Sequence, residues 1–180
     1  MQLKNKTLSK VTATAQLLGP CFMIIGIIAC CPAFSQGLLN TGATITQSAG
    51  TYIVISDGTN GSYTADALST TNLDGEGIIM TGDLSITGTA NCPACTLKLN
   101  GNGNQSILTS GNSFGNVEMD KTGEALLQDN LTITDELILT SGVITTQQAN
   151  MVIVENTASA AIPLPPSNSS FVFGKLRRYF

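Results

Sequence analysis

Histidine and tryptophan do not occur in this sequence, and charged residues make up only 11% of it. Without histidine a Ser/His/Asp catalytic relay is excluded, and no imidazole is available to complete a metal site. Without tryptophan, and with tyrosine only at Tyr52, Tyr63 and Tyr179, aromatic platforms for stacking sugars are scarce. Thr, Ser, Gly and Asn fill the surface role of Lys and Glu, which favours strands and turns over helices.

A convincing amphipathic helix is also missing beyond residue 36, and short runs of alternating apolar and polar residues recur instead. Leu97 and Leu99 alternate with polar neighbours, as do Leu131 and Ile133, so each run has one face to bury. The runs start about 6 to 12 residues apart, too close for helical crossovers. The sequence therefore predicts an all-β fold with strands at 43–47, 51–56, 77–82, 83–88, 95–101, 105–110, 115–120, 124–129, 130–135, 136–142, 143–147 and 151–155.

Two parts of the chain echo each other. DLSITGT at 83–89 matches NLTITDE at 130–136, and LKLNG at 97–101 matches LILTSG at 137–142. The offsets differ because the insert ANCPAC, Ala90–Cys95, interrupts the first copy. Repetition at this scale is typical of solenoids, in which stacked units together bury a continuous core.

These observations predict one domain at 36–159, a right-handed parallel β-helix or related solenoid. A two-sheet β-sandwich is the alternative, because short alternating strands serve both folds. A Pro-rich loop and a terminal strand follow at 160–180, and we expect them to lead into a downstream region that this sequence does not contain.

Residues 1–35 are typical of a signal peptide with a helical centre. A lysine-containing start precedes an uncharged run at 17–34, which Pro20 and Pro32 interrupt. The apolar helix between these prolines is shorter than the roughly 20 residues that cross a bilayer. An uncleaved membrane anchor is the first alternative, but the two prolines disfavour it.

Small residues at Ala33 and Ser35 favour cleavage between Ser35 and Gln36. Acylation at Cys30, in the loose lipobox GIIAC, would instead make a lipoprotein. We expect the protein to be secreted or held at the outer cell surface, with the periplasm or a lipid anchor as alternatives. No membrane association is expected once the signal has been removed.

The chain beyond the signal is acidic. This part contains five basic and twelve acidic residues, which gives a net charge of −7. Three of the basic residues cluster near the C-terminal end, too few to form a nucleic-acid footprint. Nucleic acid is therefore not an expected partner.

Cys92 and Cys95 are the cysteines that remain beyond the signal. In an oxidising compartment two thiols this close, with Pro93 between them, predict a small disulfide in a turn. A redox CxxC would need the first cysteine at a helix N-terminus, whereas the flanking residues resemble strands. A zinc site would need ligands that the sequence lacks.

Two glycine-containing stretches are candidates for ligand-binding loops. NGNGNQS at 100–106 lacks the third glycine and following helix of a dinucleotide fingerprint, so it predicts a corner between strands. DGTNGSYTAD, Asp57–Asp66, is a better calcium candidate because it holds two carboxylates. It lacks EF-hand spacing, and a hairpin loop explains it more simply. We assign no metal, no cofactor and no cofactor-binding residue.

The carboxylates are the candidate catalytic groups. Glu118 and Asp120 share a strand face beside Lys121, but they would need a cleft to act together. Asp135 and Glu136 are adjacent, so on a strand they face opposite ways. We therefore assign no catalytic residue and expect no enzyme. Outward polar rows that could bind sugars lie at Thr44/Thr46, Ser85/Thr87 and Thr132/Thr134.

The stretches GATITQSAGTYIVISDGTNGSYT at 42–64, LDGEGIIMTGDLSITGTA at 73–90 and TLKLNGNGNQSILTSGNSFGNVEMDKTGEALLQDNLTITDELILTSGVI at 96–144 carry a family resemblance. They resemble the repetitive β-helix or adhesin-like N-terminal regions of large secreted surface proteins of Bacteroidota, many of them type IX secretion cargo. The resemblance implies a non-enzymatic cell-surface scaffold or adhesin-like stalk segment. Its partners would be surface glycans or other domains of the same longer protein. The alternatives are a carbohydrate-binding module and a polysaccharide lyase or hydrolase fragment.

Overall fold

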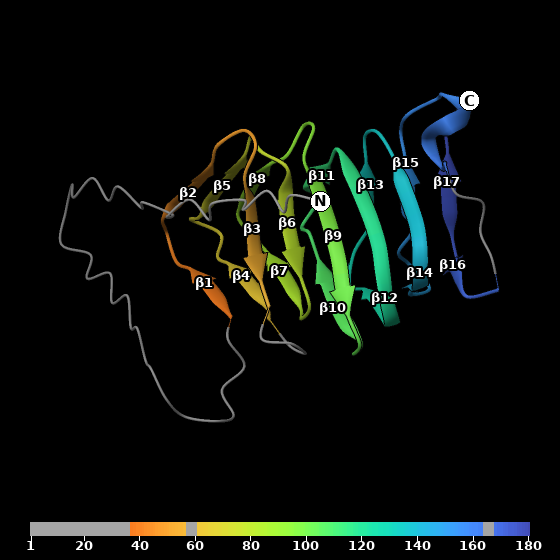
Figure 1. Ribbon diagram of the computed structural model, residues 1–180, viewed down its shortest axis with the longest axis horizontal. Helices are drawn as coiled ribbons and strands as arrows, with labels where there is room; N and C mark the ends of the chain where they lie inside the picture. Colours follow the sequence, from red (N-terminus) through yellow and green to blue (C-terminus); the bar gives the residue numbers. More distant parts are fainter. Residues whose placement is uncertain (1–36, 57–60, 164–167) are drawn as a thin grey trace, which may run out of the picture. The chain divides into compact units, whose positions relative to one another are not determined.

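The computed structural model describes residues 37–56, 61–163 and 168–180. They form a β-solenoid of about six turns whose strands stack side by side (Figure 1). Every strand pair is parallel, and no α-helix occurs in the described part of the chain. The predicted all-β parallel solenoid is confirmed, and the β-sandwich alternative is wrong because a sandwich needs antiparallel neighbours. The predicted signal peptide, its predicted Ser35–Gln36 cleavage site and the alternative acylation site Cys30 lie outside the described residues.

Each turn of the solenoid crosses three faces. Face 1, in front in Figure 1, carries β3 (Tyr52–Ile55), β6 (Gly77–Met80), β9 (Thr96–Gly101) and the first parts of β12 (Asn116–Leu127) and β14 (Leu137–Thr146). Asn116 lies opposite Thr96 in the face 1 ladder, so one turn takes 20 residues here. Side chains in register along a face therefore lie about 20 residues apart in the sequence.

The strands β12 and β14 turn the corner and continue on face 2. Face 2 also holds β1 (Leu38–Asn40), β4 (Tyr63–Ala65), β7 (Leu84–Ile86), β10 (Gln105–Leu108) and β16 (Ser170–Phe173). Register shifts on β12 between Met119 and Glu124 mark the bend from one face to the next.

Face 3 has two ladders. The first contains β2 (Thr44–Gln47), β5 (Thr70–Leu73) and β8 (Thr89–Asn91), and the second contains β11 (Ser113–Phe114), β13 (Leu131–Ile133), β15 (Val152–Val154) and β17 (Leu176–Arg178). Asn112 links them, because its side chain accepts a hydrogen bond from Ala90 N (2.8 Å) and donates one to Gly88 O (2.9 Å). A short 3-10 helix, η1 (Ser159–Ala161), lies between β15 and β16.

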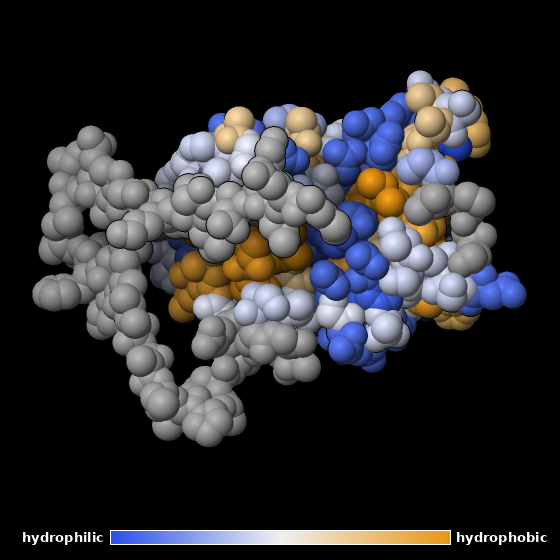
Figure 2. Space-filling view, viewed as in Figure 1, coloured by the Kyte–Doolittle hydropathy of each residue, from blue (hydrophilic) through white to orange (hydrophobic). Residues whose placement is uncertain are grey.

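The core runs through the solenoid and consists of the alternate inward residues of the strands. Leu97, Leu99, Leu131 and Ile133 are all fully buried, as the alternation predicted. The outward residues of the same strands are polar or partly exposed. In Figure 2 a hydrophobic area covers the β3 and β6 end of face 1, and a hydrophilic band covers β9 and β12.

Of the two sequence matches that suggested a repeat, one corresponds to equivalent positions in the solenoid and the other does not. The 97–101 and 137–142 segments both belong to face 1 and lie two turns apart. The 83–89 segment contains β7 on face 2, whereas 130–136 contains β13 on face 3, so this match has no structural counterpart. The supposed insert at Ala90–Cys95 is the end of β8 and the corner that follows it.

The sequence pattern did not predict five of the strands, namely β1, β4, β5, β8 and β11. Each has two to four residues, and several, such as Thr89–Asn91, carry little apolar signal. Ladder hydrogen bonds to the turns above and below stabilise such short strands, and this support is not visible in a local pattern.

Candidate functional site

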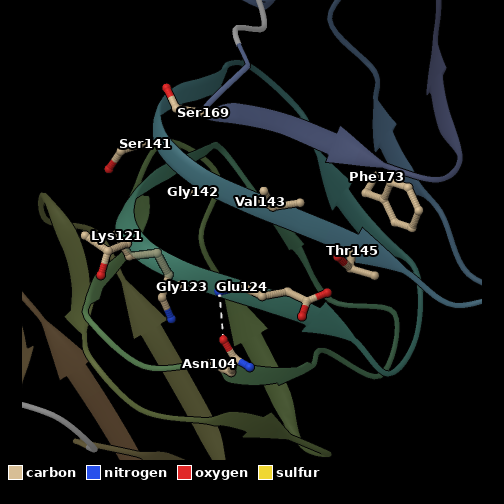
Figure 3. Close-up of a pocket in the computed structure, with 11 residues that line it drawn as sticks. Asn104, Lys121, Gly123, Glu124, Ser141, Gly142, Val143, Thr145, Ser169 and Phe173 are labelled. Atoms are coloured by element: carbon tan, nitrogen blue, oxygen red, sulfur yellow. Dashed lines mark hydrogen bonds between the residues drawn. The ribbon is translucent and has the colours of Figure 1, made fainter.

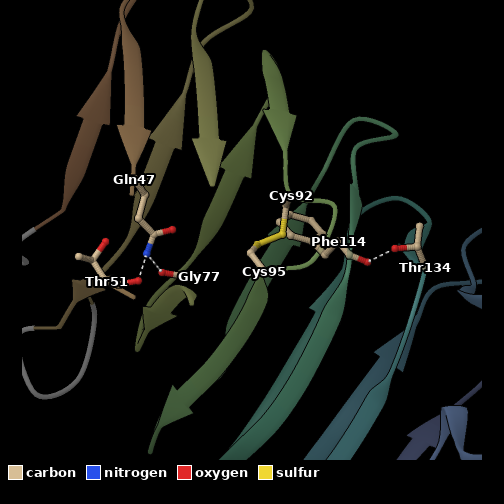
Figure 4. The surroundings of a disulfide bond; sticks show 7 residues. All are labelled: Gln47, Thr51, Gly77, Cys92, Cys95, Phe114 and Thr134. Carbon is tan, nitrogen blue, oxygen red and sulfur yellow. Dashed lines mark hydrogen bonds between the residues drawn. A yellow bond between two sulfur atoms is a disulfide. The ribbon is translucent and has the colours of Figure 1, made fainter. Parts of the chain in front are cut away.

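The predicted cysteine pair closes a corner of the solenoid. Cys92 and Cys95 form a disulfide with a Cα–Cα distance of 5.1 Å, and both side chains are buried (Figure 4). The Cys92 carbonyl accepts a hydrogen bond from Gly115 N (2.8 Å), and the Cys95 carbonyl accepts one from Asn116 N (2.9 Å). The disulfide thus fixes the corner on which the following turn stacks, next to the buried ring of Phe114.

The Glu118 and Asp120 carboxylates do share the outer surface of face 1. Their cationic partner is Lys98 of the preceding turn, whose Nζ lies 2.8 Å from Glu118 and 2.9 Å from Asp120. Ser141 Oγ donates to Asp120 at 3.3 Å. Burial opposes the charge of Lys98, but hydrogen bonds and attraction from both carboxylates raise the pKa of this amine above its ordinary value. The three groups satisfy one another on an open strand surface.

The placement of Lys121 beside these carboxylates was wrong. Lys121 alternates with Asp120 and points into the solenoid, where only 2% of its surface is exposed. Its Nζ has no hydrogen-bond partner among the described residues. Burial lowers the pKa of Lys121 to about 8, with a small opposing effect from the Asp83 charge.

A second orphaned group lies at the same corner between faces 1 and 2. Gln105 is buried, and its Nε2 donates to Gly82 O (2.7 Å) and Met80 O (3.3 Å). Its Oε1 finds no partner in the described part of the chain. The corner therefore holds a buried amine and a buried amide oxygen that are both unsatisfied, which is costly in an otherwise apolar interior.

A hollow of about 660 Å³ opens near this corner on the outer surface of face 2. In Figure 3, Glu124 and Phe173 extend from different turns, with Thr145 between them. Phe173 is 64% exposed and lies opposite Thr145 in the ladder. The side-chain Oδ1 of Asn104 accepts a hydrogen bond from Glu124 N at 3.1 Å. The remaining lining residues are Lys121, Thr122, Gly123, Ser141, Gly142, Val143 and Ser169.

The hollow combines one exposed aromatic ring with short polar side chains and a carboxylate. This mixture suits a hydroxyl-rich ligand, because the ring can contact C–H groups while the polar groups bond hydroxyls. Phe173 was missed in the sequence, where only tyrosine and tryptophan were considered as platforms. Tyr63 is buried, and its hydroxyl shares a hydrogen bond with Thr71 Oγ1 (2.5 Å), so its ring offers no exposed surface on which a sugar could stack.

The other predicted ligand groups have structural partners. Asp66, from the calcium candidate, accepts hydrogen bonds from Ser69 Oγ (2.6 Å) and Gly42 N (2.9 Å), and these bonds lower the pKa of its carboxyl. β3 pairs with β6, and β4 pairs with β1 and β7, so β3 and β4 do not form the predicted hairpin with each other. Asp57 of the calcium candidate lies outside the described residues. Within the described ranges no group of three or more Cys, Asp or Glu side chains lies close enough together to hold a metal.

Two of the predicted outward polar rows, Thr44/Thr46 and Thr132/Thr134, belong to face 3, whereas Ser85 of the third row lies in β7 on face 2. Thr44 lies opposite Thr70, which lies opposite Thr89. Beside this row, Asn91 Nδ2 donates to Asn72 Oδ1 at 2.6 Å. The rows thus hydrogen-bond partly among themselves.

No helix in the described residues is long and apolar enough to span a membrane. No protein-family model, no curated protein and no solved structure matches this chain.

Proposed function

We propose that this chain is a non-enzymatic scaffold or adhesin-like stalk segment that is exported to the cell surface. The fold supports this function because each turn contacts only its neighbours and the core continues from turn to turn, which makes a rod-like spacer. The signal-like residues 1–35 and the acidic surface support export.

The main support for the proposal is that three aspartates form hydrogen bonds between neighbouring turns. Asp66, Asp83 and Asp129 each accept a backbone hydrogen bond from a neighbouring turn, from Gly42 N (2.9 Å), Ser106 N (2.7 Å) and Thr109 N (3.1 Å) respectively. These acids tie successive turns together at the corners. Such charge-assisted hydrogen bonds hold the stack together and leave these carboxylates engaged with backbone groups of neighbouring turns.

Surface display tests the proposal. An epitope inserted between Gln148 and Ala149, in the exposed turn before β15, should leave the stack intact. We expect an impermeant antibody to label intact cells that make this protein. A matched variant without residues 1–35 should be labelled only after permeabilisation. Labelling of the full chain only after permeabilisation would contradict surface export.

Carbohydrate binding is the second candidate, and the hollow with Phe173 favours it. A glycan array separates the two functions, because a scaffold alone retains no glycan. If the hollow binds sugar, Phe173→Ala should weaken binding about tenfold through loss of the aromatic contact. Phe180→Ala is the control, since Phe180 is 97% exposed and does not line the hollow. Equal loss in both variants would argue against the hollow as the site.

A further inference from the structure

The two ends of the solenoid both present unpaired strand edges. Among the described strands, β1, β2 and β3 at one end pair only with β4, β5 and β6 of the next turn. At the other end β16 pairs only with β14, and β17 only with β15. Open parallel edges are templates for pairing with another chain. All strands run in the same direction around the turns, so the last turn of one molecule can continue the first turn of another.

Inward apolar side chains are also incompletely covered at both ends. Leu38, Ile45 and Ile53 of the first turn contact the core but are only partly buried. At the opposite end Leu176 stacks on the fully buried Val152, yet 42% of its surface is exposed. Covering these side chains would extend the hydrophobic core.

Charge distinguishes the two ends. No Lys or Arg occurs between residues 37 and 97, whereas this part contains five acidic residues. No Asp or Glu occurs between residues 156 and 180, where Lys175, Arg177 and Arg178 lie. The first turns of the solenoid are therefore acidic, and the last turn is basic.

The opposite charges also occupy the same corners. Lys175 lies at the corner between β16 and β17, and Asp66 lies at the equivalent corner between β4 and β5. Arg178 ends β17 on face 3, and Asp74 follows the end of β5 on that face. In a continued stack, these groups would be two turns apart, or roughly 10 Å, which long basic side chains can span.

We propose that this solenoid binds a second copy of itself end to end, with the last turn of one molecule on the first turn of the next. The basic residues of the last turn would then face the acidic residues of the second turn, Asp66, Asp74 and Glu76, across the first turn, whose described residues 37–56 are uncharged. β16 would add to β1 and β17 to β2. Face 1 contributes less, because the described residues between β15 and β16 form η1 and no strand. A head-to-tail contact of this kind does not close on itself, so it yields linear assemblies. The inference does not depend on export.

Analytical ultracentrifugation of the purified chain tests the proposal. At low salt we expect the average mass to rise with concentration to about twice the monomer mass or more. High salt should reduce it, because the attraction between exposed charges is screened. A mass equal to that of the monomer at every concentration and salt level would overturn the proposal.

Charge reversal makes the test specific. Lys175→Glu/Arg177→Glu leaves two acids against Arg178 in the last turn, so both ends of this molecule are acidic. Asp74→Lys/Glu76→Lys leaves two lysines against Asp66 in the second turn, so the turn that would face the basic last turn becomes basic too. We expect each variant alone to be monomeric and an equimolar mixture to associate, because opposite ends meet again only in the mixture. Glu124→Lys, in the middle of the solenoid, is the control and should associate like the unmodified protein.

Association of the two mixed variants distinguishes stacking from misfolding, because a misfolded variant cannot restore association in a mixture. Cooperative unfolding of each variant, followed by circular dichroism, checks the fold directly. Association of either reversal variant alone, or failure of two folded variants to associate when mixed, would refute the end-to-end contact. Loss of association in Glu124→Lys would likewise show that net charge, not the ends, controls assembly.

Discussion

Replacing Lys121 by methionine is expected to stabilise the folded protein by about 2 kcal/mol at neutral pH. The lysine is 2% exposed, and its ammonium group has no hydrogen-bond partner among the described residues. Methionine has a similar length, fills the same space and carries no charge to desolvate. Urea unfolding of both proteins at neutral pH measures the difference. A lower unfolding free energy in Lys121→Met would show that the amine has a partner that stabilises it.

The stabilisation should depend on pH. Burial lowers the pKa of Lys121 from 10.5 to about 8, so the folded protein releases this proton more readily than the unfolded chain does. Between these two values the unfolded state binds more protons, and the free energy of unfolding must rise with pH. We expect the unmodified protein to gain up to about 3 kcal/mol relative to Lys121→Met across this window. Near the upper end the stability of the unmodified protein should reach, and can slightly exceed, that of Lys121→Met.

Lys98→Met is the matched control for this experiment. Lys98 holds Glu118 and Asp120 on the outer surface, so its loss should destabilise the protein slightly at neutral pH. The pKa of Lys98 is raised rather than lowered, so this variant should keep the rise in stability between pH 8 and 10.5 that Lys121 causes. Loss of that rise in Lys98→Met would assign the effect to the wrong lysine.

Replacing Gly77 by alanine is expected to destabilise the protein by about 4 kcal/mol or to prevent folding. Gly77 begins β6 with a φ of 120°, a conformation that is strained for other residues. A Cβ atom there would lie 1.9 Å from Thr96 O in the β9 backbone of the following turn. Relieving this clash requires the two turns to separate, which breaks the β6–β9 ladder.

Gly111→Ala separates the clash from the backbone strain. Gly111 also has a positive φ, 82°, but an added Cβ would meet no atom within 4 Å. This variant should therefore cost only about 1 kcal/mol. Urea midpoints of the two variants give the contribution of turn-to-turn contact as their difference. Equal midpoints would show that the turns can move apart at Gly77 without loss.

Local sequence was enough to predict the strands that alternate strongly. Leu97, Leu99, Leu131 and Ile133 are buried because a strand turns alternate residues to one side, and this rule needs no knowledge of the neighbours. The short spacing between strands and the internal echo indicated stacking. The same alternation places Lys121 inward if it is followed consistently from Asp120, so this error was avoidable.

The candidate site was less accessible to sequence reasoning. Phe173 borders a hollow whose other residues, apart from the nearby Ser169, lie on other turns, as far back as Asn104, 69 positions earlier. Lys98 reaches Glu118 because the two are opposite each other in the ladder, 20 residues apart. Neither contact follows from residues that are close in the chain.

The sequence by itself determined which side chains face the core and that residues 37–97 and 156–180 carry opposite charge, because both depend on residue type and order along one strand or segment. The tertiary structure alone decided which turn lies on which. The turns vary in length at their corners, so only the hydrogen-bonded ladders set the register that brings Lys98 to Glu118 and places Lys175 at the corner equivalent to that of Asp66.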